Sequence, residues 1–406
     1  MTRYVGKQGS FRFLWFGQIL ANLGDILYVV CLIKIIFDAT GSVTFMSLVP
    51  FCSTFSGFVS GLTAPVLIQK YNLKWLLCYS QSGKILLLFV LCIFVPVFND
   101  SGLWFVFLLI SFLAFLDGWA APVRNALVPS LVEESKLLKT NSLLSISDQI
   151  VQLIAWPIGS TLMVPLGVEF ILWSTFGLFV CAAALFVLIQ PVEGKAVMEE
   201  KSTLETMIEG WMLIWTSRQL KIISFMNILE TFANGVWIAA ILFVFVSEAL
   251  NKGENWWGFI NGSFFAGMLL GGLFIYQFSR LLEKNLGKTI LWSTFCLMML
   301  TILFGTTSIP LLALLFSLLF GLPQMAREVA ETTIFQQSAR EQLLAKVYSA
   351  RSTMIYASFG ISSLVMGWIA EQWGVRVAFI FAAGLFLSSF FIAIKHKREL
   401  MIVESH

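Results

Sequence analysis

Apolar runs of about 20 residues, the length that a helix needs to cross a bilayer, recur from one end of this chain to the other. Of its 406 residues, 58% are hydrophobic and 12% are charged, against about 25% charged in ordinary soluble domains. The hydrophobic core of a soluble protein does not require a series of apolar runs of this length. Because only helices and closed barrels satisfy their backbone in lipid, runs of this length predict an all-α membrane protein.

The run boundaries predict twelve transmembrane helices in two six-helix bundles. The predicted helices are 12–37, 43–68, 73–97, 102–123, 139–164 and 168–190, then 219–247, 255–279, 287–306, 308–328, 346–370 and 374–394. We therefore expect an N-terminal bundle over 1–190 and a C-terminal bundle with a short tail over 219–406. Between them, 191–218 is a polar linker with apolar residues at helical spacing, which indicates an amphipathic helix on the membrane surface or a plain tether.

The positions of the basic residues predict the orientation of the chain. Apart from Lys34, Lys84, Lys252 and Arg376, the Lys and Arg residues fall in segments on one side of the predicted membrane. Positively charged loops face the cytoplasm. We therefore expect both termini to be cytoplasmic in a multi-pass protein of the cell (inner, cytoplasmic) membrane.

Composition also excludes several classes of function. Both histidines, His396 and His406, lie in the tail, and the six cysteines form no CxxC motif, so we expect no metal site and no cofactor. No nucleophile–base pair or phosphate-binding loop is present, which argues against an enzyme and against an ATP-driven pump. A formal charge of +3 does not suggest nucleic acid. Any proton chemistry would have to use carboxylates.

The first predicted helix carries a polar stripe that points to a transport cavity. Gln18, Asn22 and Asp25 share one helical face, and Asp25 lies about 20 Å into the run. A carboxylate at that depth needs water, a partner or a proton. The interpretation that Asp25 carries a proton or binds substrate stands beside a structural one, in which Asp25 is tied to the backbone or to Asn22.

The second half repeats this stripe. Asn227, Glu230 and Asn234 lie on the seventh predicted helix, with Glu230 about 205 residues after Asp25, as in transporters built from two repeats. Similar segments recur at this offset, including Leu-Leu-Lys-Thr-Asn-Ser at 137–142 and Leu-Leu-Ala-Lys-Val-Tyr-Ser at 343–349. We therefore expect a cavity with one acid from each half.

Other polar residues within the predicted membrane helices are further candidates. Asp148 and Gln152 on the fifth helix and Tyr356 on the eleventh could line the cavity. Lys84 and Asp117 lie on consecutive antiparallel helices at depths that differ by roughly 7 Å. An ion pair between them would lower the cost of burying both charges.

The chain resembles the major facilitator superfamily, and within it the macrolide-efflux and enterobactin-exporter branch of drug:proton antiporters. The segments that carry the resemblance are 11–18 (F-R-F-L-W-F-G-Q), 23–25 (L-G-D), 40–42 (T-G-S), 122–132, 137–142 and 336–349. The resemblance implies a proton-coupled exporter in which two six-helix bundles rock about a central site.

Two positions depart from the family pattern. The signature loop between helices 2 and 3 has a gating aspartate, but here Gln69 takes its place, followed by Lys70 and Lys74. The mid-membrane arginine that many antiporters carry on helix 4 is replaced by Leu113. Both departures weaken the family's usual gating and coupling arrangement.

From these observations we expect a secondary transporter that exports a small amphipathic compound, such as an antibiotic, a secondary metabolite or a siderophore. Protons would be the coupling ion, the lipid bilayer its surroundings, and a monomer its default state. One alternative is a lipid or lysophospholipid flippase on the same fold. Another is a membrane sensor or assembly partner that transports nothing.

Overall fold

We describe a computed structural model of the chain, which covers residues 2–40, 43–94, 102–190, 203–237, 239–253, 255–339 and 341–401. Within these ranges the secondary structure is helical and no strand occurs. The first part of the expected linker, 191–202, and the end of the tail, 402–406, lie outside the described residues. The predicted all-α membrane class is confirmed.

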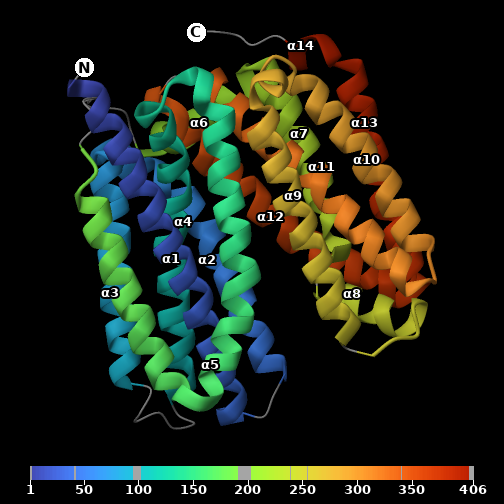
Figure 1. Ribbon diagram of the computed structural model, residues 1–406, viewed down its shortest axis with the longest axis horizontal. Helices are drawn as coiled ribbons and strands as arrows, with labels where there is room; N and C mark the ends of the chain where they lie inside the picture. Colours follow the sequence, from blue (N-terminus) through green and yellow to red (C-terminus); the bar gives the residue numbers. More distant parts are fainter. Residues whose placement is uncertain are drawn as a thin grey trace. The chain divides into compact units, whose positions relative to one another are not determined.

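The first half of the chain forms long helices that run side by side (Figure 1). They are α1 (Thr2–Thr40), α2 (Val43–Lys70), α3 (Leu73–Phe94), α4 (Leu103–Leu131) and α5 (Leu137–Val187). The shorter linker helix α6 (Thr203–Thr216) follows them in the chain. Helix α5 combines two predicted helices. They meet at Gly167, whose φ of 79° breaks the helical backbone at a position suited to glycine.

The second half begins with a broken helix. Helix α7 (Arg218–Ala233) passes into a 3₁₀ turn at Asn234–Trp237, and α8 (Ala239–Val244) ends in a π turn at Phe245–Ala249. The helices that follow are α9 (Asn255–Glu283), α10 (Leu286–Thr306), α11 (Pro310–Ser338), α12 (Glu341–Trp373), α13 (Val375–Lys395) and α14 (Lys397–Met401).

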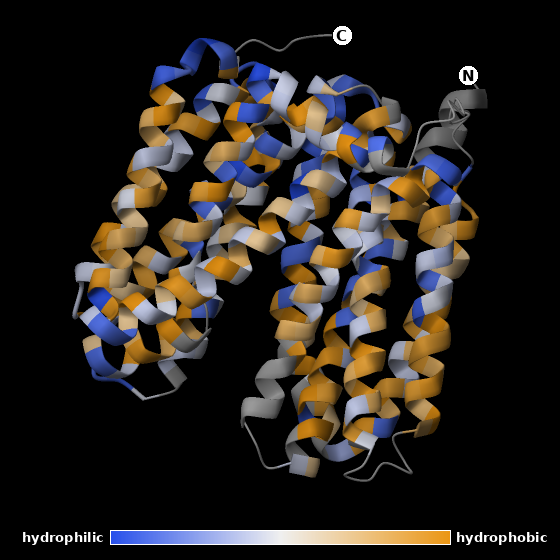
Figure 2. Ribbon diagram, turned by 180° about the vertical axis from the view of Figure 1, so that it is seen from behind, coloured by the Kyte–Doolittle hydropathy of each residue, from blue (hydrophilic) through white to orange (hydrophobic). Residues whose placement is uncertain are grey.

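Ten helices in the described part of the chain are long and apolar enough to cross a membrane. The bent pair Arg218–Trp237 and Ile241–Ala249 passes the same test together, which gives eleven if it is counted as one span. The remaining predicted helix, 139–164, is present as the first part of α5. Figure 2 shows hydrophobic residues along the helices and hydrophilic residues gathered towards their ends, as expected for segments surrounded by lipid.

The chain forms two compact units, and each includes a helix end from the other half of the sequence. One unit comprises residues 1–133, 150–211 and 341–353, and the other comprises 134–149, 212–340 and 354–406. In the second unit, Ser142 at the start of α5 donates a hydrogen bond to the Gly272 carbonyl, 2.6 Å away. In the first unit, Ser349 at the start of α12 donates to the Gly61 carbonyl. The repeat predicted from sequence thus includes an equivalent exchange of helix ends.

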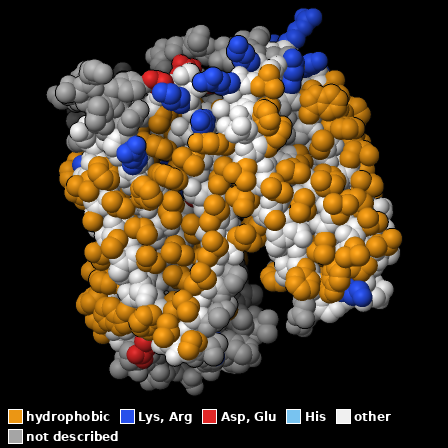
Figure 3. Space-filling model, in the orientation of Figure 1, with side chains coloured by type: hydrophobic (Ala, Val, Ile, Leu, Met, Phe, Trp, Pro, Cys, Tyr) orange, Lys and Arg blue, Asp and Glu red, His pale blue; other side chains and the backbone are white. Residues whose placement is uncertain are grey.

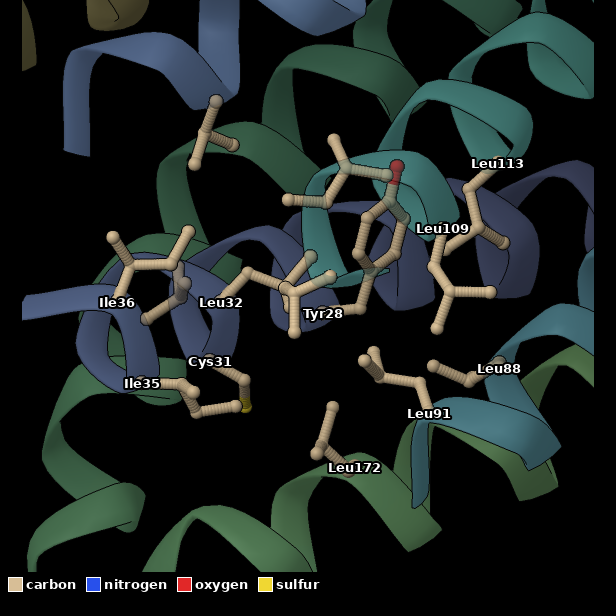
Figure 4. Packing of buried hydrophobic residues seen from close by; sticks show 14 of the residues in the cluster. Tyr28, Cys31, Leu32, Ile35, Ile36, Leu88, Leu91, Leu109, Leu113 and Leu172 are labelled. Atoms are coloured by element: carbon tan, nitrogen blue, oxygen red, sulfur yellow. The ribbon is translucent and has the colours of Figure 1, made fainter. Parts of the chain in front are cut away.

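Each unit has an apolar core in which side chains from several of its helices pack together. In the first unit, buried side chains of α1, α3, α4 and α5 form one cluster around Tyr28, Leu88, Leu109 and Leu172 (Figure 4). In the second, Trp237 packs against Phe304 and Phe320, with ring centroids 4.6 and 4.8 Å apart. The polar clusters described below are anchored to helices that these cores position.

The outer surface is apolar. On the face shown in Figure 3, hydrophobic side chains cover the sides of the helices, while Lys and Arg side chains gather near one end. On α4, Trp104 and Leu108 are 71% and 50% exposed. Such side chains would be costly to leave in water, so this surface is suited to contact with lipid.

Helices α4 and α11 continue through prolines and past their predicted ends. Helix α4 continues through Pro122 and Pro129, and α11 continues through Pro323 to Ser338, although prolines usually end helices in soluble proteins. In a membrane protein, neighbouring helices can satisfy the carbonyl that each proline frees. Arg327, near the end of the predicted helix 308–328, lies inside α11 and is 3% exposed, so it was wrong to count it with the basic residues of the cytoplasmic segments.

The linker helix α6 docks on the start of α12 within the first unit. Glu209 and Lys346 form an ion pair at 2.6 Å, with side chains 21% and 9% exposed. A Cβ at Gly210 would overlap the Lys346 carbonyl, so only glycine allows this close approach. Helix α6 is therefore packed against the bundle, which a plain tether would not require.

Candidate functional site

The first unit contains a charged cluster within its membrane-spanning helices, made of Asp25 (α1), Lys84 (α3) and Asp117 (α4), which we call the first cluster. Lys84 Nζ lies 2.6 Å from Asp25 Oδ1 and 2.9 Å from Asp117 Oδ1. The Lys84 side chain is 2% exposed, Asp25 is 21% exposed and Asp117 is 51% exposed. One buried ammonium therefore serves two carboxylates of different accessibility.

Packing of α3 against α4 and α5 fixes the position of Lys84. Ser80, one turn before it, donates a hydrogen bond to the Leu116 carbonyl at 2.7 Å. The Lys84 ammonium also lies 4.8 Å from the centre of the Phe179 ring on α5, a distance at which the ring attracts a cation. The ammonium is thus held between the acids and an aromatic face.

Asp117 does not share the face of α4 that carries its exposed apolar side chains. From Leu108, which is 50% exposed, to Asp117 the helix turns about two and a half times. The two side chains therefore lie on opposite faces of α4. A half-exposed carboxylate on this face can meet water or a solute without facing lipid.

The second unit contains an equivalent cluster, made of Glu230 (α7), Arg327 and Glu331 (both α11), which we call the second cluster. Arg327 Nε donates a hydrogen bond to Glu230 Oε2, and Arg327 Nη1 lies 3.9 Å from Glu331 Oε2. The Glu230, Arg327 and Glu331 side chains are 5%, 3% and 4% exposed. This cluster again has two carboxylates for one cation, but it is buried throughout.

Neutral donors from neighbouring helices complete the second cluster. Thr294 of α10 and Ser389 of α13 both donate to Glu230 Oε1, Thr294 from 3.3 Å. Asn227, one turn before Glu230 on α7, donates to Glu331 Oε1. Glu230 therefore receives three donors, one of them charged, which stabilises its ionised form.

The other predicted polar residues lie as follows. Gln18 Nε2 donates to Asn22 Oδ1 at 2.5 Å, one turn before Asp25. Asn234 is the C-cap of α7. Asp148, Gln152 and Tyr356 are partly buried on α5 and α12 and belong to neither cluster as defined above.

The predicted gating loop is a tight turn between α2 and α3. Gln69 is partly buried near the end of α2, and Lys70, its last residue, is exposed. Lys74 in the first turn of α3 is 5% exposed, and its ammonium lies 4.8 Å from the centre of the Trp75 ring. The basic residues of this loop thus differ strongly in their access to solvent.

Sequence reasoning missed Arg327 and Glu331 of the second cluster, and also Thr294 and Ser389, the two hydroxyl donors to Glu230. The first two were recognisable, because they stand at i and i+4 in a stretch that continues with apolar residues at helical spacing. Thr294 and Ser389 carried no comparable signal, since isolated hydroxyl residues are common in membrane helices and many bond their own backbone.

Comparison with known proteins decides the family. The family model described as Major Facilitator Superfamily matches residues 14–362. The chain belongs to the major facilitator superfamily. The transporter resemblance stated from sequence is thereby confirmed, and this superfamily member is a multi-pass membrane transporter rather than an enzyme.

Relatives and solved structures agree with this assignment. The uncharacterized MFS-type transporter YfmI of Bacillus subtilis is 31% identical over 379 residues, covering 92% of this chain and 93% of the relative. Macrolide efflux protein A of Streptococcus pyogenes is 20% identical over 408 residues, covering 95% and 96%. The crystal structure of a bacterial homologue of the iron transporter ferroportin, in an outward-facing state, superposes with a TM-score of 0.78. It is 15% identical, with 96% of this chain and 99% of that one covered, so this likeness shows the fold alone.

Proposed function

We propose that this transporter exports a small cationic amphipathic compound in exchange for protons, by alternating access of the two bundles. The observation that carries the proposal is the first cluster, in which Lys84 contacts both Asp25 and Asp117 within membrane-spanning helices. If all three groups are ionised, the cluster has one uncompensated negative charge. That charge is costly in the membrane unless something neutralises it.

Two different species can neutralise the first cluster. A proton on either carboxylate leaves one anion facing one ammonium. A monovalent cation beside Asp117, the more exposed acid, gives two anions facing two cations. A proton and a cation together would leave a net positive charge, which is again unfavourable at low dielectric. Binding of the two is therefore mutually exclusive, as exchange requires.

The direction and location of transport follow from one relative and from the positions of the basic residues. The relative named as a macrolide efflux protein supports export and an antibiotic-like substrate. The basic residues predict that both termini face the cytoplasm, which would place the transporter in the cell (inner, cytoplasmic) membrane with its substrate leaving the cell. We expect it to work as a monomer without a cofactor.

The test uses one cationic and one neutral fluorescent compound in cells that overproduce the protein. We expect lower accumulation of the cation, with energy-dependent export lost in Asp117→Asn and kept in Glu328→Gln, an exposed acid outside both clusters. If Asp117→Asn exported each compound as well as the wild type does, Asp117 would not be the residue that recognises the cation. Movement of a labelled lipid in proteoliposomes without a pH gradient would favour the flippase alternative instead.

A further inference from the structure

One face of the linker helix α6 carries large apolar side chains that remain exposed. Ile208, Met212 and Trp215 are 44%, 60% and 45% exposed. Their spacing along the chain places them within about 60° of one another around an α-helix, so together they form one stripe along α6. We call these three residues the linker stripe.

The opposite side of α6 is the side that faces the rest of the protein. Gly210 and Ile214 lie on that side. Gly210 is so close to the Lys346 carbonyl of α12 that a Cβ would overlap it, and Ile214 is fully buried. Turning the linker stripe inwards would break this packing. The stripe can therefore be covered only by something outside the helices on which α6 docks.

The residues that follow the linker stripe identify lipid as its partner. Trp215 stands three residues before Arg218, where α7 begins the bent pair of helices that is apolar enough to span a membrane. Tryptophan is enriched at the membrane–water interface. Lys221 Nζ lies 5.6 Å from the centre of the Trp215 ring, and Arg218, which pairs with Glu399, is 72% exposed. Two accessible cations thus stand beside the apolar stripe at the depth of lipid headgroups.

We propose that the linker stripe binds the membrane surface, and that anionic lipid headgroups hold it there through Lys221 and Arg218. The apolar side chains enter the boundary between headgroups and acyl chains, as in other interfacial helices, and the two cations contact lipid phosphates. Glu205, the exposed acid in the first turn of α6, lies about 15 Å along the helix from Trp215, away from these cations. The binding surface involves no transported compound and no exchanged proton, so it is independent of the proposed exchange.

Spin labelling measures whether lipid covers the linker stripe. Met212→Cys is labelled in the full-length protein after the exposed Cys181 and Cys296 are replaced by serine, and the protein is placed in vesicles that contain phosphatidylglycerol. We expect the label to collide with oxygen, which dissolves in lipid. We also expect it to be shielded from a water-soluble nickel complex.

Two exposed glycines provide the reference positions. A label at Gly177→Cys, on the membrane-spanning part of α5, reports a position in lipid, and one at Gly253→Cys, in an exposed loop, reports a position in water. If the Met212→Cys label were as accessible to nickel as the Gly253→Cys label, water would cover the stripe. If it were shielded from both reagents, protein would cover the stripe. Either result would overturn the proposal.

Vesicles of phosphatidylcholine alone test the part played by anionic headgroups. We expect the Met212→Cys label to lose its shielding from nickel in them. Lys221→Gln should raise the proportion of phosphatidylglycerol needed for half-maximal shielding, whereas Lys284→Gln, which removes another exposed lysine, should leave it unchanged. Equal shielding with and without phosphatidylglycerol, or equal proportions for the two glutamine variants, would contradict the binding of anionic headgroups beside the stripe.

Discussion

Asp25 and Lys84 meet 2.6 Å apart inside the first unit, and Glu230 and Arg327 meet in the same way inside the second. In each half, an acid on the first membrane helix contacts a cation that a later helix of that half supplies. The two halves differ in which helix supplies the cation: α3 provides Lys84, and α11 provides Arg327. The repeat thus preserves a charge relationship while changing the residues that make it.

Removing the shared ammonium should destabilise the first unit. Lys84→Met would leave two carboxylates without their counter-charge, and breaking a buried ion pair costs about 3–5 kcal/mol. Because Asp117 is half exposed, we expect the lower end of that range. The measurement is thermal unfolding of the purified protein, with the exposed Lys284 replaced by Met as the matched control.

The same measurement on double variants shows how the three charges are coupled. Lys84→Met should cost less when Asp25→Asn or Asp117→Asn is already present, because each removes one of the carboxylates left unpaired. Strict additivity in both backgrounds would mean that the ammonium stabilises the unit by packing alone.

Docking of α6 on α12 predicts a charge-reversal effect. Glu209→Lys or Lys346→Glu should each reduce transport and stability, because each places like charges where a 2.6 Å ion pair now lies. The double reversal should recover much of the loss. If the double reversal lost as much transport and stability as the two single losses added together, the ion pair would contribute nothing to docking.

Close approach at Gly210 gives an independent test of that docking. Gly210→Leu should weaken it even with both charges intact, because its side chain would overlap the Lys346 carbonyl. Gly177 on α5, where a Cβ would meet nothing within 4 Å, provides the control substitution. Equal transport by the two leucine variants would count against a docked linker.

Glu399 on α14, beyond the last membrane span, should make stability sensitive to acid. A backbone hydrogen bond at Glu399, aided by the Arg218 guanidinium 2.7 Å away and by His396, holds the pKa of this carboxyl below its usual range. Its stabilising effect is therefore complete above the unfolded pKa of about 4.3, and it is lost as the pH falls through the lower folded pKa. Unfolding curves of the wild type and Glu399→Gln should differ at neutral pH and converge in acid. A constant difference at all pH values would exclude this linkage.

Much of the fold follows from the sequence because a chain surrounded by lipid must satisfy its own backbone hydrogen bonds. Long apolar runs must become helices, and matched acids at a fixed offset indicated the repeat. Spacing along one helix does not reveal which helices become neighbours. Lys84 was therefore matched with Asp117 but not with Asp25, although it contacts both.

The second cluster was harder to predict for a local reason. The predicted helix 308–328 ended just after Arg327 and before Glu331, and Arg327 was counted with the basic residues on one side of the membrane. In the structure α11 continues to Ser338, and burial turns Arg327 and Glu331 into partners for Glu230. A charged pair at i and i+4 followed by apolar residues can thus mark a continuing membrane helix.

Substrate-induced proton movement in proteoliposomes tests the central claim most directly. With a pH-sensitive dye trapped inside, adding a cationic substrate to wild-type vesicles should move protons against the direction of the substrate. Asp25→Asn should abolish that proton signal, because its first cluster is already neutral and has no proton to exchange. Substrate transport in the wild type without proton movement, or an unchanged proton signal in both Asp25→Asn and Glu230→Gln, would contradict the account.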